Sequence, residues 1–575
     1  IYRSTNGGLS WTKIYASPFA NDGSTRDLRL AISPANPQKI YAFIGTTNGT
    51  TAIKVVVSND GGTSWTDMGA TGIDPGQFGY NTYIQVDPTD ANNVYVGTRD
   101  VYKSTNGGQS WSSITKNFTF NSSNNSFSYN PFNSNSHSDQ HSFAFAPDDP
   151  TNILYIGNDG GLWKSTDGGA HFNSMNATLA LTQFVGLAMH PTDATRTYGG
   201  AQDNGTQFRT PSGNWQEFAE GDGGHPVVNA PDPSVVFSTY VFGAIRWWRF
   251  NADGTRSEIS SRRTSETTFG ESTSNPRIAF YPPFTNNGVD ATVYFGTWRL
   301  FVSTTYADST QPLGWTAPGG TTDLTKGTTS LGPDVINAIG VARTGYSNAQ
   351  VIYTGSAQGR AMVSINGGQT WTDITAGLPN RTITSIKVDP LVPSTAYLTV
   401  SGYGTGHVFK TVNTGATWTD ISGTPGLSTS LPNIPTSDLL IDPLVPTTIY
   451  AATDIGVFRS LNGGTAWETF NPGLPPTVVT SFATNASGQI QIGTYGRGAY
   501  QLTTASTGPA TIQFSAPTYS FSEGVGDATI NVTRTGDTSS AVSVDYRTVD
   551  ADTFTVGCSD TVNNQGAAYA RCDFA

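Results

Sequence analysis

The chain has 575 residues, among them 64 glycines and 32 prolines, and only 13% of its residues are charged. This length exceeds one ordinary compact core, so a very large repeat domain or several domains are expected. The chain has 30 basic and 42 acidic residues, which gives a net charge of −12, so we expect no nucleic-acid partner. It contains no run of 18 apolar residues, which argues against membrane insertion.

A short motif of the form Ser-x-Asp/Asn-x-Gly-x-Ser/Thr-aromatic recurs along the chain. Complete copies begin at Ser4, Ser58, Ser104, Ser165, Ser364, Thr411 and Ser460. The long gap in this series has room for three degenerate copies, which we expect near Ser212–Trp215, Asp253–Gly254 and Ser303–Trp315. The Asp or Asn side chain can accept backbone N–H groups within a turn, and the glycines permit a positive φ. We therefore interpret the motif as structural.

A second motif recurs with the same period as the first: an apolar strand ends in a proline turn, and a strand that contains tyrosine follows. Val86–Pro88 before Val94–Gly97 is one example, and Ile441–Pro443 before Ile449–Tyr450 is another. Each unit then reads as four short strands, A to D, separated by turn signals, and units of this kind at a period near fifty residues indicate a β-propeller. Strand A is expected to begin near residues 27, 81, 141, 184, 225, 276, 336, 382, 436 and 478.

The predicted fold is therefore all-β, with a multi-bladed propeller over residues 1–505. The tenth unit has inner strands at 478–503, while residues 1–14 supply outer strands without inner ones. Joining these halves would close a single ring of about ten blades, which we favour. The alternative is two propellers.

These motifs resemble Asp-box (BNR) repeat propellers, a group that includes sortilin-type receptors, xyloglucan-cleaving glycoside hydrolases and sialidases. The segments Gly157–Gly161, Gly200–Gly205 and Gly493–Gly498 are most similar to large bacterial sortilin-like proteins of this kind. The resemblance implies a secreted or cell-surface protein of bacterial origin. The Arg-Ile-Pro segment and the arginine set expected of a sialidase are not found.

After a linker at residues 506–510, the alternation changes, and residues 511–575 are predicted to form part of a β-sandwich. Ser522–Gly524 and Val532–Gly536 resemble the opening half of a Calx-beta domain. That resemblance implies calcium as a candidate cofactor, with loop carboxylates of Glu523, Asp550 and Asp552 as ligands; the alternative is that they are solvated loop acids. Cys558 and Cys572 are predicted to form one disulfide in an oxidising compartment; the alternative is two free thiols.

The A–B and C–D turns of a propeller share one face, and the B–C and D–A loops share the other. The repeat motif occupies C–D turns, so the opposite face is the natural binding face. His137, Asp139 and His141 would point the same way in an extended strand. B–C turns hold Asp159 and Asp203, and the next D–A loop holds Glu220, Asp222 and His225. All of these are expected on the face opposite the motif.

Three interpretations of this cluster stay open. It is an Asp–His hydrogen-bond network, a metal site of His137, Asp139 and His141, or a glycosidase acid–base pair. Such a pair needs one protonated and one ionised carboxyl group several ångströms apart. The catalytic candidates are Asp139, Asp159, Asp203 and Asp222. Further candidates for contacts to sugars or peptides, all near B–C turns, are Trp298, Arg299, Arg360, Tyr403 and Arg497.

The leading functional hypothesis is a secreted or surface propeller that binds a glycan or an extracellular protein on the face opposite the repeat motif. A polysaccharide-degrading glycoside hydrolase with paired carboxylates on that face is the first alternative. A structural subunit of an extracellular assembly is the second.

Overall fold

The computed structural model describes most of the chain. It covers residues 1–16, 26–46, 52–121, 126–129, 135–251, 255–258, 264–272, 276–304, 314–342, 351–502, 511–514, 519, 529–535 and 543–544. Two compact units are present, residues 1–502 and 503–575. The described residues form antiparallel strands and two short 3-10 turns, so the predicted all-β class is confirmed. No described helix is long and apolar enough for a membrane span.

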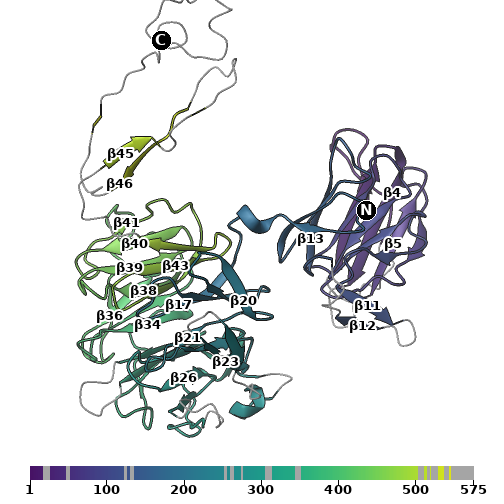
Figure 1. The fold of residues 1–575 in the computed structure, drawn as a ribbon. Helices are drawn as coiled ribbons and strands as arrows, with labels where there is room; N and C mark the ends of the chain where they lie inside the picture. Colours follow the sequence, from purple (N-terminus) through teal and green to yellow (C-terminus); the bar gives the residue numbers. More distant parts are fainter. Residues whose placement is uncertain are drawn as a thin grey trace, which may run out of the picture. The chain divides into compact units, whose positions relative to one another are not determined.

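The first unit begins with three four-stranded antiparallel sheets, which we call blades N1 to N3 (Figure 1). Blade N1 contains β3 (Arg26–Ser33), β4 (Asn36–Thr46), β5 (Ile53–Ser58) and β6 (Thr66–Gly69). Blade N2 contains β7 (Tyr83–Val86), β8 (Val94–Gly97), β9 (Val101–Ser104) and β10 (Ser112–Ser113). Blade N3 contains β13 (Gln140–Phe145), β14 (Leu154–Asn158), β15 (Gly161–Ser165) and β16 (Asn173–Ser174). Two hairpins accompany them, β1 (Tyr2–Arg3) with β2 (Thr12–Lys13) and β11 (Phe118–Asn121) with β12 (Ser126–Tyr129).

Seven further sheets, blades 1 to 7, follow in chain order. The first two are β17 (Phe184–Met189), β18 (Thr197–Ala201), β19 (Thr206–Arg209), β20 (Trp215–Ala219), then β21 (Val227–Val228), β22 (Val235–Thr239), β23 (Ile245–Phe250), β24 (Arg256–Glu258). Blades 3 and 4 are β25 (Phe284–Asn286), β26 (Val293–Gly296), β27 (Leu300–Ser303), then β30 (Ile336–Val341), β31 (Ile352–Ser356), β32 (Ala361–Ser364), β33 (Thr372–Asp373), with the hairpin β28 (Thr328–Thr329) and β29 (Gly332–Pro333) between them. Blades 5 to 7 are β34 (Ile383–Val388), β35 (Ala396–Val400), β36 (Val408–Thr411), β37 (Thr419–Asp420), then β38 (Thr436–Ile441), β39 (Ile449–Thr453), β40 (Gly456–Ser460), β41 (Glu468–Thr469), then β42 (Val479–Thr484), β43 (Ile490–Thr494), β44 (Ala499–Leu502).

Blades 1 to 7 close into a ring of their own. The first strand, β17, packs against β42 and β43 of the last blade. Across this seam Thr480 Oγ1 donates to the Phe184 carbonyl at 2.6 Å, and Thr197 Oγ1 donates to Gln491 Oε1 at 2.8 Å. The favoured single ring of ten blades is therefore wrong, because β17 meets β42 while β13 packs on β7 and β8. The alternative of two propeller bodies agrees with this arrangement.

The positions of the strands follow the sequence prediction closely. The innermost strands begin at residues 26, 83, 140, 184, 227, 284, 336, 383, 436 and 479. The first degenerate copy of the motif falls at a C–D connection, between β19 and β20. The second, Asp253–Gly254, lies outside the described residues, as does most of the third. In the third, Thr316 bridges to Val302 in place of a fourth strand.

The repeat turns are locked by their own side chains. In blade 4, Ser364 Oγ accepts the Gly368 N–H at 2.8 Å and donates to Asn366 Oδ1 at 2.9 Å. The same Asn366 oxygen accepts the Thr370 N–H at 2.9 Å. Each complete copy of the motif has this pattern, which satisfies turn N–H groups that the strands leave unpaired.

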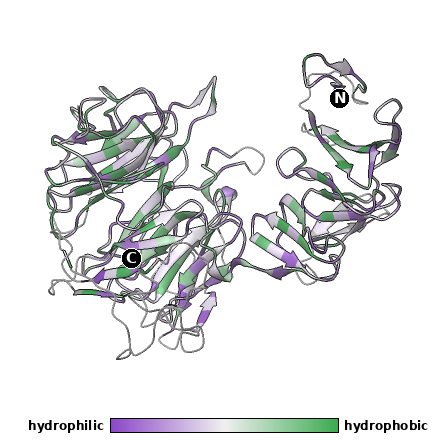
Figure 2. Ribbon diagram, turned by 90° about the horizontal axis from the view of Figure 1, so that it is seen from above, coloured by the Kyte–Doolittle hydropathy of each residue, from purple (hydrophilic) through white to green (hydrophobic). Residues whose placement is uncertain are grey.

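Apolar residues line the strands, and the connecting loops are more polar (Figure 2). Second strands carry a recurrent buried tyrosine: Tyr41, Tyr95, Tyr198, Tyr294 and Tyr353. Two of these tyrosines tie neighbouring blades together, since Tyr41 donates to the Ala91 carbonyl at 2.8 Å and Tyr353 donates to the Pro393 carbonyl at 3.1 Å. Burial of these aromatic rings between sheets is the main attraction between blades.

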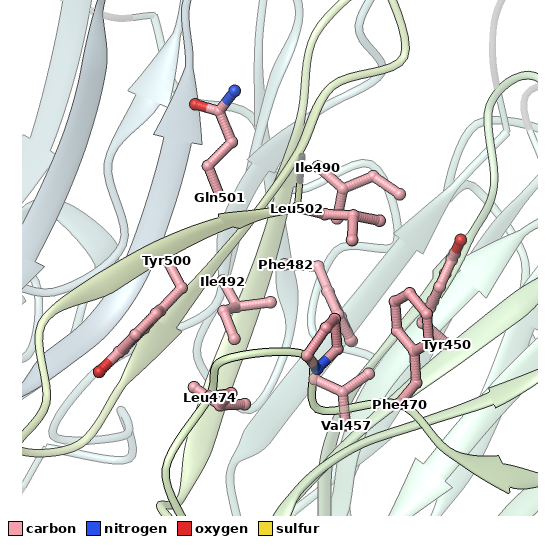
Figure 3. A pocket seen from close by; sticks show the side chains of 11 residues that line it. Tyr450, Val457, Phe470, Leu474, Phe482, Ile490, Ile492, Tyr500, Gln501 and Leu502 are labelled. Atoms are coloured by element: carbon pink, nitrogen blue, oxygen red, sulfur yellow. The ribbon is translucent and has the colours of Figure 1, made fainter. Parts of the chain in front are cut away.

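Among the described residues, blade 7 has three strands. A small apolar pocket lies between blades 6 and 7, and Figure 3 shows Tyr500 and Leu502 of β44 at its wall. Its other side is formed by Tyr450 and Phe470 of blade 6.

The second unit is described only in part. An antiparallel pair is formed by β45 (Thr511–Phe514) and β46 (Val532–Thr535). The partial β-sandwich therefore stays a prediction. The linker at 506–510 and the residues Glu523, Asp550, Asp552, Cys558 and Cys572 lie outside the described residues.

Candidate functional site

Four aspartates come together where blade N3 meets blade 1; we call them the acid cluster. They are Asp139 before β13, Asp159 in the β14–β15 turn, Asp203 in the β18–β19 turn and Asp222 in the loop before β21. Asp159, Asp203 and Asp222 lie at the connections that the sequence predicted. Backbone N–H groups make two of the links: the Asp159 N–H donates to the Asp139 carbonyl at 3.2 Å, and the Asp203 N–H donates to Asp222 Oδ1 at 3.4 Å.

Asp203 has the most perturbed carboxyl group of the cluster. Its pKa is raised to about 7, first by burial and then by the charge of Asp159. The charges of Asp222 and Asp139 add to this, as does a hydrogen bond with the Asp159 carboxyl group. Like charges in a partly dry site oppose ionisation, so Asp203 keeps its proton close to neutral pH. The protonated Asp203 carboxyl group therefore lies among other ionisable side chains of the cluster.

Asp159 has a histidine partner. His141 Nε2 lies 2.5 Å from Asp159 Oδ1, and this contact raises the pKa of His141. The Tyr80 ring, 60% exposed, meets the His141 imidazole edge-on at 4.9 Å between centroids. Partial desolvation and the charges of Asp159, Asp203 and Asp139 raise the pKa of Tyr80 to about 12, so its hydroxyl remains a neutral donor.

Asp139 is held from blade N2. Buried Asn81 donates to Asp139 Oδ1 at 2.8 Å, while burial and then the charge of Asp159 raise the pKa of Asp139. Both Asp139 and Asp203 adopt left-handed backbone, with φ of 62° and 58°. Aspartate tolerates this region better than most residues, but the conformation still costs free energy and is concentrated at functional sites.

The segment before β13 departs from the predicted extended strand. β13 starts at Gln140, and the left-handed turn at Asp139 breaks the alternation expected for His137, Asp139 and His141. The His137 ring nitrogens face backbone carbonyls instead, Nδ1 at 3.0 Å from Ser138 O and Nε2 at 2.9 Å from Asp203 O. No set of three His, Cys, Asp or Glu residues suited to a metal is found in the described part of the chain. The interpretation of these three residues as a metal site is therefore wrong.

Two tyrosines that sequence reasoning missed complete the cluster. Tyr281, in the segment before β25, donates to Asp222 Oδ1 at 3.1 Å. Tyr495 follows β43 in blade 7 and donates to Gln202 Oε1 across the seam of the ring. Tyr495 is 41% exposed, and burial together with the charges of Asp203 and Asp159 raises its pKa. A tyrosine directly after a strand end was the available signal, but only ring closure places Tyr495 here.

Of two further predicted neighbours, His225 lies away from the cluster, while Glu220 lies in the loop of Asp222. Burial, and then the charges of Asp222, Asp203 and Glu220, raise the pKa of Tyr240. His225 is held inside the ring, where burial lowers its pKa to about 4 and its electrostatic neighbours are Asp438 and Lys387 on blades 6 and 5. Glu220 is exposed, and its charge raises the pKa of Glu217 after burial does. The structure shows no contact of either side chain with the four aspartates.

The remaining candidates divide into two groups. The first group lies at the rim of blades 3 and 4. Trp298 Nε1 donates to Glu271, Arg299 donates to the Phe269 carbonyl, and Arg360 pairs with Asp373 at 3.0 Å. These donors are already engaged inside the protein. Tyr403 is an exposed residue of the β35–β36 connection, and Arg497 is an exposed residue two positions after Tyr495.

Comparisons with known proteins find structural neighbours alone. No protein-family model matches the chain, and no curated protein matches it. Among solved structures, a GH74 enzyme from Niastella koreensis shares 16% identity, with 82% of this chain and 83% of that chain covered and a TM-score of 0.25. The GH74 xyloglucanase from Xanthomonas campestris shares 15% identity, with 82% and 90% covered and a TM-score of 0.21.

Proposed function

We propose that the protein hydrolyses glycosidic bonds of an extracellular polysaccharide at the acid cluster. The observation that carries this is Asp203, whose pKa of about 7 leaves a protonated carboxyl group beside other carboxylates. Carboxyl groups held in different protonation states within one site are what acid–base cleavage of a glycoside requires.

Asp203 acts as the general acid and donates its proton to the leaving-group oxygen. Asp159 shares a hydrogen bond with Asp203 and pairs with His141, so it sets the protonation of the acid. Asp139 acts as the second carboxylate, since it interacts with Asp203 through charge and not through a hydrogen bond. As general base it takes a proton from the water that attacks the anomeric carbon, while the glycosidic C–O bond breaks and its oxygen leaves with the proton of Asp203. A raised pKa also makes the ionised Asp139 a stronger base.

The direct test is the release of reducing ends from a panel of soluble polysaccharides. Asp203→Asn and Asp139→Asn should each lower kcat by roughly 10²–10⁴-fold, the usual contribution of a positioned acid or base. Asp454→Asn is the matched control, because Asp454 occupies the same turn of blade 6, between β39 and β40, without a neighbouring acid cluster. Full activity of Asp203→Asn would overturn the assignment.

Binding without hydrolysis is the second candidate, and the exposed rings of Tyr80 and Tyr495 beside the acids favour it. Aromatic faces stack on sugar rings, and polar groups nearby fix their orientation. This function predicts retention of a glycan on an array with no reducing-end release. Tyr80→Ala and Tyr495→Ala would then abolish retention, while Asp203→Asn would leave it largely intact. A secreted or cell-surface location suits either function.

A further inference from the structure

Seven exposed aliphatic side chains lie on the face of the ring that carries the repeat turns, opposite the B–C turns and D–A loops. We call them the apolar strip: Ile365, Leu391, Val392, Val412, Leu444, Val445 and Leu461. Their exposed fractions range from 47% to 65%. Scattered exposed aliphatics are ordinary, but a group of this size on one face marks an interaction surface.

The strip runs over three consecutive blades, 4 to 6. Its members come from two kinds of turn that hydrogen bonds hold side by side. In blade 5 the Thr414 N–H donates to the Ser394 carbonyl at 2.9 Å, and in blade 6 the Gly463 N–H donates to the Thr447 carbonyl at 2.8 Å. The bond from Tyr353 to Pro393 joins blade 4 to the same turn of blade 5.

The fold itself does not require apolar residues at these turns. In blade 5, Asp389 Oδ1 accepts the N–H groups of Leu391 and Val392 at 2.8 and 3.0 Å. In blade N2, Asp87 Oδ1 accepts the N–H groups of the corresponding Thr89 and Asp90 at 2.8 and 3.3 Å. The same turn geometry therefore accommodates either the aliphatic pair Leu-Val or the polar pair Thr-Asp.

The second kind of turn shows the same contrast. The position after the first serine or threonine of the motif is aliphatic in blades 4 to 6. In the other complete copies it is polar: Thr5, Asn59, Thr105 and Thr166. In the described residues, both kinds of turn are therefore aliphatic together in blades 5 and 6, and the repeat turn is also aliphatic in the adjacent blade 4.

We propose that the apolar strip is a self-association surface, which packs against the same strip of a second copy about a two-fold axis. From its exposed fractions, the strip presents on the order of 750 Å², close to the ~800 Å² that each partner contributes to a standard interface. Two strips together supply the area that a stable dimer needs, and pairing them removes both from water.

Salt dependence distinguishes a second copy from an oppositely charged partner. Each copy carries a net charge of −12, so two copies repel at long range, and added salt screens this repulsion while leaving apolar burial intact. Self-association should therefore strengthen as the salt concentration rises. Docking of a basic partner would weaken under the same change.

The test is sedimentation equilibrium of the full chain over a range of concentrations at low and high salt. The expected mass rises from 60.8 kDa toward twice that value, and rises further at high salt. The variant L391T/V392D/L444T/V445D installs the Thr-Asp pair of blade N2 and should stay monomeric with an unchanged melting temperature. Leu331→Thr is the control, because Leu331 is 81% exposed on the β28–β29 hairpin outside the strip, and it should still dimerise.

A second variant guards against an indirect effect of altering the proline turns. I365T/V412T/L461T changes only the repeat turns, to a residue that three other copies carry, and should weaken the dimer at least tenfold. A wild-type chain that stays at the monomer mass at every concentration and salt overturns the proposal. A dimer that persists in both variants also overturns the proposal.

Discussion

The hydroxyl of Tyr353 in blade 4 donates a hydrogen bond to the carbonyl oxygen of Pro393 in blade 5, at 3.1 Å. The tyrosine ring is fully buried and the bond crosses from one blade to the next. One residue therefore stabilises the ring twice, by burying an aromatic surface and by satisfying a turn carbonyl of its neighbour.

Tyr353→Phe should lower the free energy of unfolding by about 0.5–1.5 kcal/mol, because the ring stays but the Pro393 carbonyl loses its donor. Denaturant titration at equilibrium measures this. Tyr294→Phe is the control: it lies on the second strand of blade 3, and its buried hydroxyl has no hydrogen-bond partner among the residues that the structure describes. Its removal should be neutral or slightly stabilising, and equal losses for both variants would contradict the role assigned to the bond.

Ser364→Ala should lower the free energy of unfolding by about 1–3 kcal/mol, since the buried Gly368 N–H loses its acceptor. Ser364→Thr is the matched variant. Thr411 occupies the same place in blade 5 and accepts the Gly415 N–H at 2.9 Å. The threonine variant should therefore keep most of the stability in the same denaturant titration, and a loss equal to that of alanine would argue against the hydroxyl.

Gly200→Ala should destabilise the ring by about 1–3 kcal/mol through overpacking. A Cβ atom at Gly200 would lie 1.8 Å from the backbone oxygen of Gly224, in the loop that also carries Asp222. Gly157 has the corresponding place in blade N3, where a Cβ would meet only the Ser142 side chain, at 2.4 Å to Oγ. Gly157→Ala should therefore cost less, because a serine hydroxyl can rotate away. Melting temperatures of the two variants provide the comparison.

The contribution of Asp203 to stability should fall as the pH rises from about 4 to above 7, while that of His225, whose pKa is lowered to about 4, rises over the lower part of this window. Asp203 has a pKa of about 7 when folded, against an ordinary value of 3.8, so the folded state binds the extra proton in this window and loses that advantage as pH rises. The raised pKa of His141 acts in the same direction: its contribution is complete below its unfolded value and is lost as pH rises through the folded value. Asp203→Asn should flatten the dependence of melting temperature on pH, whereas Asp454→Asn should change it less. An unchanged slope in Asp203→Asn would contradict the assignment.

The sequence predicted strands better than it predicted which blades are neighbours. Turn signals and the tyrosine strands are local, so the beginnings of the inner strands were placed within a few residues, with the largest error before Phe284. Closure of the ring depends on how β17 meets β42, about 300 residues away, and no local signal records this contact. The favoured ten-bladed ring failed for that reason.

The acid cluster was partly accessible from the same topology. B–C turns and D–A loops share a face, which is why Asp159, Asp203 and Asp222 could be grouped from the sequence alone. The backbone at Asp139 could not be foreseen from alternation, because its positive φ turns the chain. Tyr495 was missed because a contact between blades 1 and 7 exists only in a closed ring.

Among the described residues, blades 1 and 7 share no strand. Their join is held by apolar packing, by side-chain hydrogen bonds, by an isolated antiparallel bridge between Gln183 and Tyr495, and by the N–H groups of Gly496 and Gly498, which donate to the Thr182 carbonyl at 3.1 Å. Mechanical tension applied between residues 184 and 502 would load this short join directly. Because Tyr495 also donates to Gln202 across it, a stretched molecule would separate Tyr495 from the acid cluster as the join opens.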